Sequence, residues 1–546
     1  MNHTLLGTRL LVVTLVTMAH ASGGLARAQQ ELEHFAVIVN AGNPQNELSL
    51  NALRLIYLGQ QRYWGSGKGI ELVLNRAGSD EKKLLLSKVY DMTEAQLKKH
   101  WVELIYRNQI SSPPSTYPSR ETALQAVVRD PRAIALLHST VAQGAASLKI
   151  LRIDGRLPGQ DGYPLTLQQA MRLDPIGLGG PASAQGARFA RQEPEDEADT
   201  GGEETEGFEI IPRVLLRGFT HFELGARDNP AFVSTRESEG AFALGGLDLF
   251  LTSRLSERAS FLNETVFEPT EDGEYVLDVE RVIFKYEFGD FLNVQAGRFH
   301  TTIGYWNEAY HHGEWLQTSA GRPRILAFED DGGLLPVHMI GLVFKGRHMS
   351  QHLQTDYSLE LGNGRGPAAD PPQITIDAND PKALNLGLTL HPLTLAGLSV
   401  GGSWYADSIP GNPDPLIGPV HTALDERIWS ASLRYQENGW EALGEYFAIE
   451  HESSGPSADS DGYYLQISRQ IERWTPYARY EAVSVDDADT FFADLDDLER
   501  WLLGVRWDFG DWSALKLQYA HADVTDDASG TQGDEDELEL QLSFAF

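Results

Sequence analysis

The sequence contains no cysteine, so disulfide bonds and thiolate metal sites are excluded. Basic residues are also scarce, with 44 Lys and Arg against 78 Asp and Glu, and the formal net charge is -34. Because proteins bind phosphate backbones with an excess of positive charge, this balance argues against nucleic acid as a partner. No apolar run reaches the roughly 20 residues that a membrane-spanning helix needs.

A short apolar run, Leu10 to Met18, follows Arg9 near the start of the chain. Ala26 and Ala28 then stand in the A-x-A arrangement that signal peptidase recognises. We therefore expect residues 1–28 to be a signal peptide that directs export. Without a candidate helix, residence in a membrane requires a β-barrel, which pairs all its backbone groups internally.

Three regions of different composition follow. Residues 33–170 mix strand and helix patterns and predict an α/β domain. Residues 171–208 are rich in Gly, Pro, Glu and Asp, and such a stretch cannot bury a core. We expect it to be a solvated linker that tethers, rather than fuses, the α/β domain to residues 209–546.

Residues 209–546 alternate apolar and polar side chains with a period of two, as in "RVIFKYEF", "WLLGVRWDF" and "ELELQLSFAF". Short turns alternate with longer connections rich in Gly, Pro and Asp, and the count of alternating runs is about sixteen. This layout predicts an antiparallel transmembrane β-barrel. The alternative is a large soluble β-sandwich or propeller, which would have an Ile- and Val-rich buried face and more even turns.

The last strand ends on the aromatic residue Phe546, which resembles the C-terminal signature of Gram-negative outer-membrane proteins. In length and layout, residues 210–546 resemble sixteen-stranded porins. The resemblance implies an outer-membrane location, contact with lipid and lipopolysaccharide, and recognition of Phe546 by the assembly machinery. It also implies a homotrimer and places the N-terminal domain in the periplasm.

The alternation stops between His300 and Val337, the longest connection. In porins the third long loop lies at this place and narrows the lumen, so the resemblance implies a constriction loop here. Its candidate site residues are His300, Tyr305, Trp306, His311, His312, Glu314, Arg322, Arg324, Glu329, Asp330 and Asp331. Candidate basic residues of the lumen wall are Arg281, Lys285, Arg434, Arg479, Arg506 and Lys516, which suit an anion path or the paired charges of a general porin.

A metal site is an alternative for the same loop, because imidazole and carboxylate ligands suit zinc or another transition ion. The candidate ligands are His311, His312, Glu314, Glu329, Asp330, Asp331 and His338. Their spacing does not select a metal, so the metal stays unknown, and we expect no other cofactor. The chain has no H-E-x-x-H motif, and we expect no enzymatic activity.

Residues 35–155 resemble one lobe of the periplasmic phosphate-binding proteins that serve ABC importers. In that family a loop after the central strand holds phosphate at a helix N-terminus. The positions that match it here include Arg76, Gly78 and Ser79, while Asp80 and Glu81 depart from the pattern.

Together these features predict a passive channel for small hydrophilic solutes, with phosphate or another oxyanion as a candidate. The alternatives are a non-conducting barrel with an adhesive or envelope-organising role, or a metal-uptake receptor.

Overall fold

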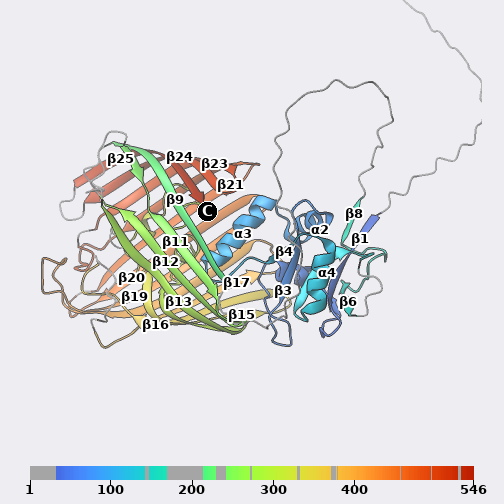
Figure 1. Ribbon diagram of the computed structural model, residues 1–546. Coiled ribbons are helices and arrows are strands. Elements are labelled where there is room, and N and C mark those ends of the chain that lie inside the picture. Colours follow the sequence, from blue (N-terminus) through green and yellow to red (C-terminus); the bar gives the residue numbers. More distant parts are fainter. Residues whose placement is uncertain are drawn as a thin grey trace, which may run out of the picture.

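The computed structural model describes residues 32–141, 147–168, 213–228, 241–270, 274–328, 333–369, 377, 379–455, 457–493, 495–526 and 531–546. The expected signal peptide (1–28) and the expected linker (171–208) lie outside the described residues. The described chain forms an α/β region followed by a β-barrel (Figure 1).

The α/β region has a central sheet with the strand order β4-β3-β5-β1-β6, in which β8 also pairs with β1. Its strands are β1 (Leu32–Asn40), β2 (Glu47–Leu48), β3 (Glu71–Asn75), β4 (Ser115–Tyr117), β5 (Ala133–His138), β6 (Leu148–Ile150), β7 (Arg152–Ile153) and β8 (Thr166–Gln168). Its helices are α1 (Leu50–Tyr57), α2 (Asp80–Leu84), a π-helical turn (Leu85–Tyr90), α3 (Glu94–Tyr106) and α4 (Arg120–Arg129). The predicted α/β class is confirmed.

Helix α3 begins after the N-cap residue Thr93. The Thr93 hydroxyl accepts the Gln96 amide at 3.2 Å, and the Gln96 side chain accepts the Thr93 amide at 2.8 Å. Such a capping box satisfies two N–H groups that the helix itself leaves unpaired. Among the described residues, no helix is both long enough and apolar enough to cross a membrane.

The C-terminal region forms a closed antiparallel barrel. Its strands are β9 (Arg213–Asp228), β10 (Ala241–Leu244), β11 (Leu247–Arg254), β12 (Ala259–Pro269), β13 (Tyr275–Gly289), β14 (Leu292–His300), β15 (His338–Met349), β16 (Leu353–Asn363), β17 (Ala383–Pro392), β18 (Leu398–Ile409), β19 (Leu424–Glu437), β20 (Trp440–Glu452), β21 (Ala458–Arg469), β22 (Trp474–Ser484), β23 (Asp497–Gly510), β24 (Ser513–Asp526) and β25 (Thr531–Ala545). Both β10 and β11 pair with β9. If β10 and β11 are counted as one interrupted strand, the described residues form sixteen barrel strands, as the sequence predicted.

The two faces of the wall differ in polarity. On β13 the side chains of Val282 and Phe284 are 38 % and 47 % exposed, whereas those of Arg281 and Lys285 point inward and are buried. An apolar exterior around a polar interior is the pattern of a barrel that spans a lipid bilayer. Phe546 closes the ring, since its amide and carbonyl exchange 3.1 Å hydrogen bonds with Gly218 of β9.

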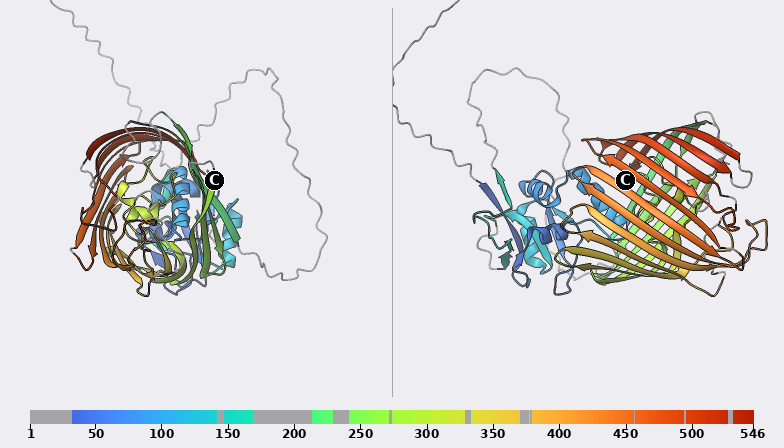
Figure 2. Two further views of the ribbon diagram at one scale, coloured as in Figure 1. Left: turned by 90° about the vertical axis from the view of Figure 1, so that its left-hand side faces the viewer. Right: turned by 180° about the vertical axis from the view of Figure 1, so that it is seen from behind.

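The α/β region packs directly against the end of the barrel that carries the short turns (Figures 1 and 2). In the view along the barrel, the blue helix α3 and the yellow-green segment after β14 lie inside the ring of strands (Figure 2, left). The sequence predicted only a tether between the two parts. The linker stays a prediction, but the sequence did not predict the contact: α3 buries part of its apolar surface, including Val102 and Ile105, against the barrel interior.

The backbone at Gly297 of β14 requires glycine. Its φ is +138°, and an added Cβ would lie 1.8 Å from the Val282 carbonyl oxygen. We expect Gly297→Ala to destabilise the folded barrel by about 1–3 kcal/mol, as overpacking commonly does. The measurement is the urea concentration at the midpoint of unfolding of the refolded protein. Unfolding is detected by the heat-modifiable mobility of the barrel on gels. Gly225→Ala is the matched control, because no atom lies within 4 Å of its added Cβ; equal losses would contradict the steric argument.

Candidate functional site: the occupied lumen

The described residues between β14 and β15, 301–328 and 333–337, fold inside the barrel and carry the short helix α5 (Tyr305–Ala309). Trp306 is 1 % exposed and packs edge-on against Tyr464 of β21 and Tyr310, with ring centroids 5.8 and 4.8 Å apart. These buried aromatic side chains anchor the segment to the wall. The alternation of the sequence stops here because the segment leaves the sheet and folds into the lumen.

The barrel wall also caps α5. Gly304 precedes the helix and has no side chain to accept its first amides. The Glu445 carboxylate of β20 does so instead, accepting the amides of Tyr305 and, at 3.0 Å, Trp306. A carboxylate is favourable at a helix N-terminus, where N–H groups lack partners within the helix. Tyr464 donates to the same carboxylate at 2.5 Å, which fixes its position.

Basic side chains of the wall hold the rest of the segment. Arg506 donates to the carbonyls of Trp315 and Gln317, both at 2.7 Å. The Lys516 ammonium donates to the carbonyl of Glu314 at 2.6 Å. These two cations are buried, so carbonyl oxygens replace the water that they lose.

Two other basic residues predicted for the lumen wall, Arg479 and Arg434, also contact the inserted segment. Arg479 is buried and donates to the Arg322 carbonyl at 3.0 Å. Arg434 is less buried and stacks over the Tyr305 ring, with 4.8 Å from its guanidinium carbon to the ring centroid. The structure therefore places these side chains in the interior, but as supports of the inserted segment.

Arg281 and Lys285 instead bind the α/β region. Arg281 pairs with Glu264 of β12 and donates to the Tyr106 carbonyl at 2.7 Å. The Lys285 ammonium donates to the Asn108 carbonyl at 2.6 Å. Tyr106 is the last residue of α3 and Asn108 lies two residues beyond it, at the end where a helix leaves its last C=O groups unpaired. Two wall cations thus cap a helix that belongs to another region of the chain.

The apolar end of α3 fits between wall aromatics. The Tyr106 ring is fully buried and lies 5.5 Å from the ring of Phe219 on β9 and 5.7 Å from that of Phe250 on β11. Its hydroxyl accepts the His312 amide at 3.0 Å. Tyr106 therefore contacts the wall and the inserted segment together.

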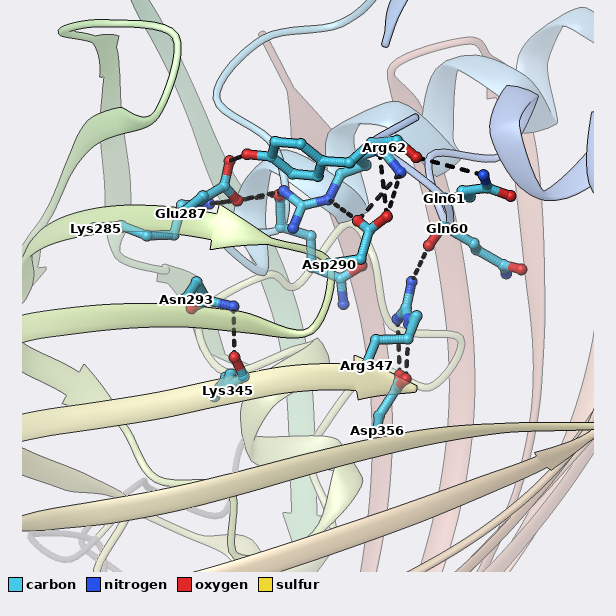
Figure 3. Close-up of polar contacts among 12 residues, drawn as sticks. Gln60, Gln61, Arg62, Lys285, Glu287, Asp290, Asn293, Lys345, Arg347 and Asp356 are labelled. Carbon is cyan, nitrogen blue, oxygen red and sulfur yellow. Dashed lines mark hydrogen bonds and ion pairs between the residues drawn. The ribbon is translucent and has the colours of Figure 1, made fainter. Parts of the chain in front are cut away.

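Ion pairs and hydrogen bonds also join the α/β region to the barrel near its short turns, at the rim (Figure 3). Arg62 pairs with Glu287 at the end of β13, and its amide lies 3.1 Å from an oxygen of Asp290 in the following turn. Burial raises the pKa of the Asp290 carboxyl, against the lowering effect of Arg62. Arg347 of β15 donates to the Gln60 carbonyl at 2.8 Å, as Figure 3 also shows.

Lys99 of α3 lies beside the inserted segment, with its ammonium 5.8 Å from the centre of the Trp315 ring. Burial and, next, the neighbouring Arg506 guanidinium lower the pKa of Lys99 to about 8. A solvated lysine has a pKa of about 10.4. Docking of α3 therefore becomes more favourable as the pH rises from about 8 towards 10.

Other candidates of the loop have local partners. Arg322 stacks on Phe328 and donates to the Leu326 carbonyl at 2.8 Å, and the Arg324 amide donates to Glu481 at 2.8 Å. Glu314 accepts a hydrogen bond from the Gln317 amide group. Three further candidates lie outside the described residues: Glu329, Asp330 and Asp331.

Histidines of the loop meet a carboxylate that the sequence analysis missed. Glu280 of β13 lies within 4.8 Å of ligand atoms on His300, His311 and His338. Strict alternation from Arg281 would place Glu280 on the outer face. The pairing of β12 with β13 shifts register between Glu264 and Val266, and such a bulge turns Glu280 inward.

The predicted anion-binding positions of the α/β region serve a local turn. The Ser79 hydroxyl accepts the Lys82 amide at 3.2 Å and donates to the Arg76 carbonyl at 2.9 Å. Gly78 has a φ of +79°, a conformation that favours glycine in this turn. Helix α2 that follows has five residues, and its first two, Asp80 and Glu81, are acidic.

One stretch, Gly397 to Gly401, reads G-L-S-V-G and matches the G-x-S-x-G pattern of hydrolases. In hydrolases the serine stands on a sharp strand-to-helix turn. Here Ser399 is the second residue of β18, which continues as a wall strand to Ile409. The match therefore lacks the structural context of a nucleophile.

No protein-family model matches the chain, and no curated protein sequence matches it either. Several solved outer-membrane proteins are similar in fold. An anion-selective porin from Comamonas acidovorans has 12% identity over 62% of this chain and 100% of its own, with a TM-score of 0.44. The channel DcaP of Acinetobacter baumannii has 12% identity over 61% and 97%, with a TM-score of 0.43. A loop-deletion mutant of OmpT of Vibrio cholerae has 13% identity over 61% and 99%, with a TM-score of 0.41.

The rim ion pairs give a test of docking. We expect Arg62→Met to loosen the contact, because Glu287 and Asp290 then keep partly buried negative charge without their cation. The opening free energy from hydrogen exchange of residues 58–64 should fall by about 1.5–3 kcal/mol. Arg76→Met, at an exposed arginine of the same region, should leave it unchanged. Unchanged exchange in Arg62→Met would show that the rim contacts do not hold the domain.

Proposed function

We propose that the chain is an outer-membrane porin-like channel for small hydrophilic solutes, which the docked α/β region closes at one end. The observation that carries the proposal is the closed sixteen-stranded barrel with an apolar exterior, a polar interior and an inserted loop. This is the architecture of a diffusion pore with a constriction.

Buried wall cations hold both inserted parts: Arg479, Arg506 and Lys516 bind the loop, and Arg281 and Lys285 bind the end of α3. The two parts differ at the rim, where the α/β region adds contacts that solvent reaches. At the rim, Lys98 of α3 pairs with Asp511, and their side chains are 39% and 48% exposed. Exposed ion pairs contribute little to stability. We therefore infer that the α/β region moves to open the channel while the loop stays in place as its constriction.

The solute is proposed at the level of small polar molecules. Phosphate gains no separate support from the α/β region, where the Ser79 hydroxyl is engaged in a helix cap. Phosphate titration against channel current tests it directly: block at low concentration supports an oxyanion pore, and indifference supports a general one.

Location and assembly are part of the same proposal. Barrels of this kind place their short turns in the periplasm, and the α/β region contacts those turns at Asp290 and Asp511. We infer a periplasmic α/β region, a barrel among lipid and lipopolysaccharide, and a homotrimer. Phe546 is 52% exposed, which leaves its ring accessible to assembly machinery.

A second candidate is a non-conducting barrel that organises the envelope. The apolar cluster that continues from Tyr106 through Phe219 to Trp315 across the lumen favours it. A metal-uptake receptor would need a path through the lumen along which the bound metal ion could leave.

A reversible cross-link separates these functions. Because the natural chain has no cysteine, Lys98→Cys and Asp511→Cys are the only thiols in the double variant. A short cleavable bis-thiol linker joins them across the rim. We expect conductance in planar bilayers to be lower with the linker intact than after its cleavage, because the linker keeps α3 docked.

The single variant Lys98→Cys, treated with the same reagent, should conduct equally before and after cleavage. Absence of current from the cleaved double variant and from the natural chain would exclude a channel and favour the non-conducting barrel. Equal current with and without the linker would exclude the α/β region as the gate.

A further inference from the structure

Four side chains converge on one point of the inner wall. They are Glu280 of β13, His300 at the end of β14, His311 of the inserted loop and His338 at the start of β15. Their ligand atoms all lie within 4.8 Å of one another, and each side chain is buried. Three strands that follow one another in the wall and one loop therefore contribute a donor each.

The orientation of His311 is fixed by its neighbour. The Asn307 amide nitrogen donates to the carbonyls of Thr301 at 3.0 Å and Val337 at 2.9 Å. Its oxygen, 2.8 Å from His311 Nδ1, must therefore accept from that nitrogen. A neutral His311 then carries a lone pair on Nε2, and this atom faces a Glu280 oxygen at 3.3 Å. Two electron-rich atoms repel each other unless a proton or a metal ion lies between them.

His300 is the second, independent observation. Within the described parts of the chain, neither of its ring nitrogens has a hydrogen-bond partner, although the side chain is 4% exposed. Its Nε2 lies 3.5 Å from an oxygen of Glu264, and that oxygen is already paired with Arg281. Buried polar groups are normally satisfied, and those left over call for an unplaced partner. The His300 ring centroid lies 3.7 Å from that of His311 and 5.1 Å from that of His338.

We propose that Glu280, His300, His311 and His338 bind one zinc ion. Three imidazole nitrogens and a carboxylate oxygen form a four-coordinate donor set of the kind that zinc prefers. Asn307 is the positioning residue, because a hydrogen bond to the remote ring nitrogen of a histidine ligand sets its tautomer. His312, with Nε2 at 3.3 Å from the other Glu280 oxygen, holds the carboxylate from the opposite side.

The proposed ion would fasten the inserted loop to the wall. His311 lies just after α5, whereas the other three ligands belong to β13, β14 and β15. Removal of the ion would release the start of the constriction while leaving the α/β region bound at the rim. Zinc binding itself does not depend on whether the barrel conducts.

Cobalt provides a visible probe of the full-length protein. The protein is refolded in detergent, stripped with chelator, and titrated with Co²⁺ and then Zn²⁺. We expect the protein to bind one equivalent of Co²⁺ with the intense visible absorption of tetrahedral coordination. One equivalent of Zn²⁺ should then displace it. Saturation at one equivalent separates this site from weak binding at exposed acidic loops.

Two variants and a control complete the test. Glu280→Gln and His311→Ala should each weaken Co²⁺ binding at least about tenfold. His352→Ala, at an exposed turn histidine, should bind as the natural chain does. Folding is checked by heat-modifiable mobility, and Glu280→Gln, which preserves shape, keeps the test valid if His311→Ala fails to fold. The proposal is overturned if the folded natural chain gives no tetrahedral spectrum, which would indicate protonated histidines paired with Glu280. Unchanged binding in folded Glu280→Gln would also overturn it.

Discussion

Each cation buried on the inner wall needs an acceptor, and in this barrel main-chain carbonyls of two inserted segments supply them. A charged side chain that leaves water loses its hydration, and only hydrogen bonds or opposite charges can replace it. Arg506 and Lys516 find their acceptors in the loop, whereas Lys285 finds its acceptor at the end of α3. The wall, the loop and the α/β region therefore form one polar network.

That network gives the two inserted parts different roles. The loop has buried aromatic anchors, a wall carboxylate at its helix N-terminus, and the Glu280 and histidine cluster at its start. The α/β region inserts one helix end and otherwise relies on partly exposed ion pairs such as Arg62 with Glu287. Our proposal of a fixed constriction and a removable cover rests on this difference, because the solvent screens the second set of contacts more than the first.

The sequence predicted the barrel well, because alternation and turn length are local properties of each strand. Sixteen strands were expected from them, whereas the inserted loop was expected from the resemblance to porins. Docking of α3 was missed, since its Val102 and Tyr106 look like part of an ordinary amphipathic helix until the barrel is present. Glu280 was missed because a bulge in β13 shifts the alternation by one residue. Anion binding at Arg76, Gly78 and Ser79 rests on a family pattern and stays a prediction; the Ser79 hydroxyl caps α2 and donates to the Arg76 carbonyl.

The central claim is that the end of α3 lies inside the barrel. Because the natural chain has no cysteine, Val102→Cys places a single thiol at a position that is 2% exposed and packed against the barrel interior. The reaction of this thiol with a small maleimide is measured for the full-length protein in liposomes, beside Ala95→Cys on the exposed start of α3. The account predicts that the thiol at position 102 reacts many times more slowly than the thiol at position 95. Equal rates would contradict it.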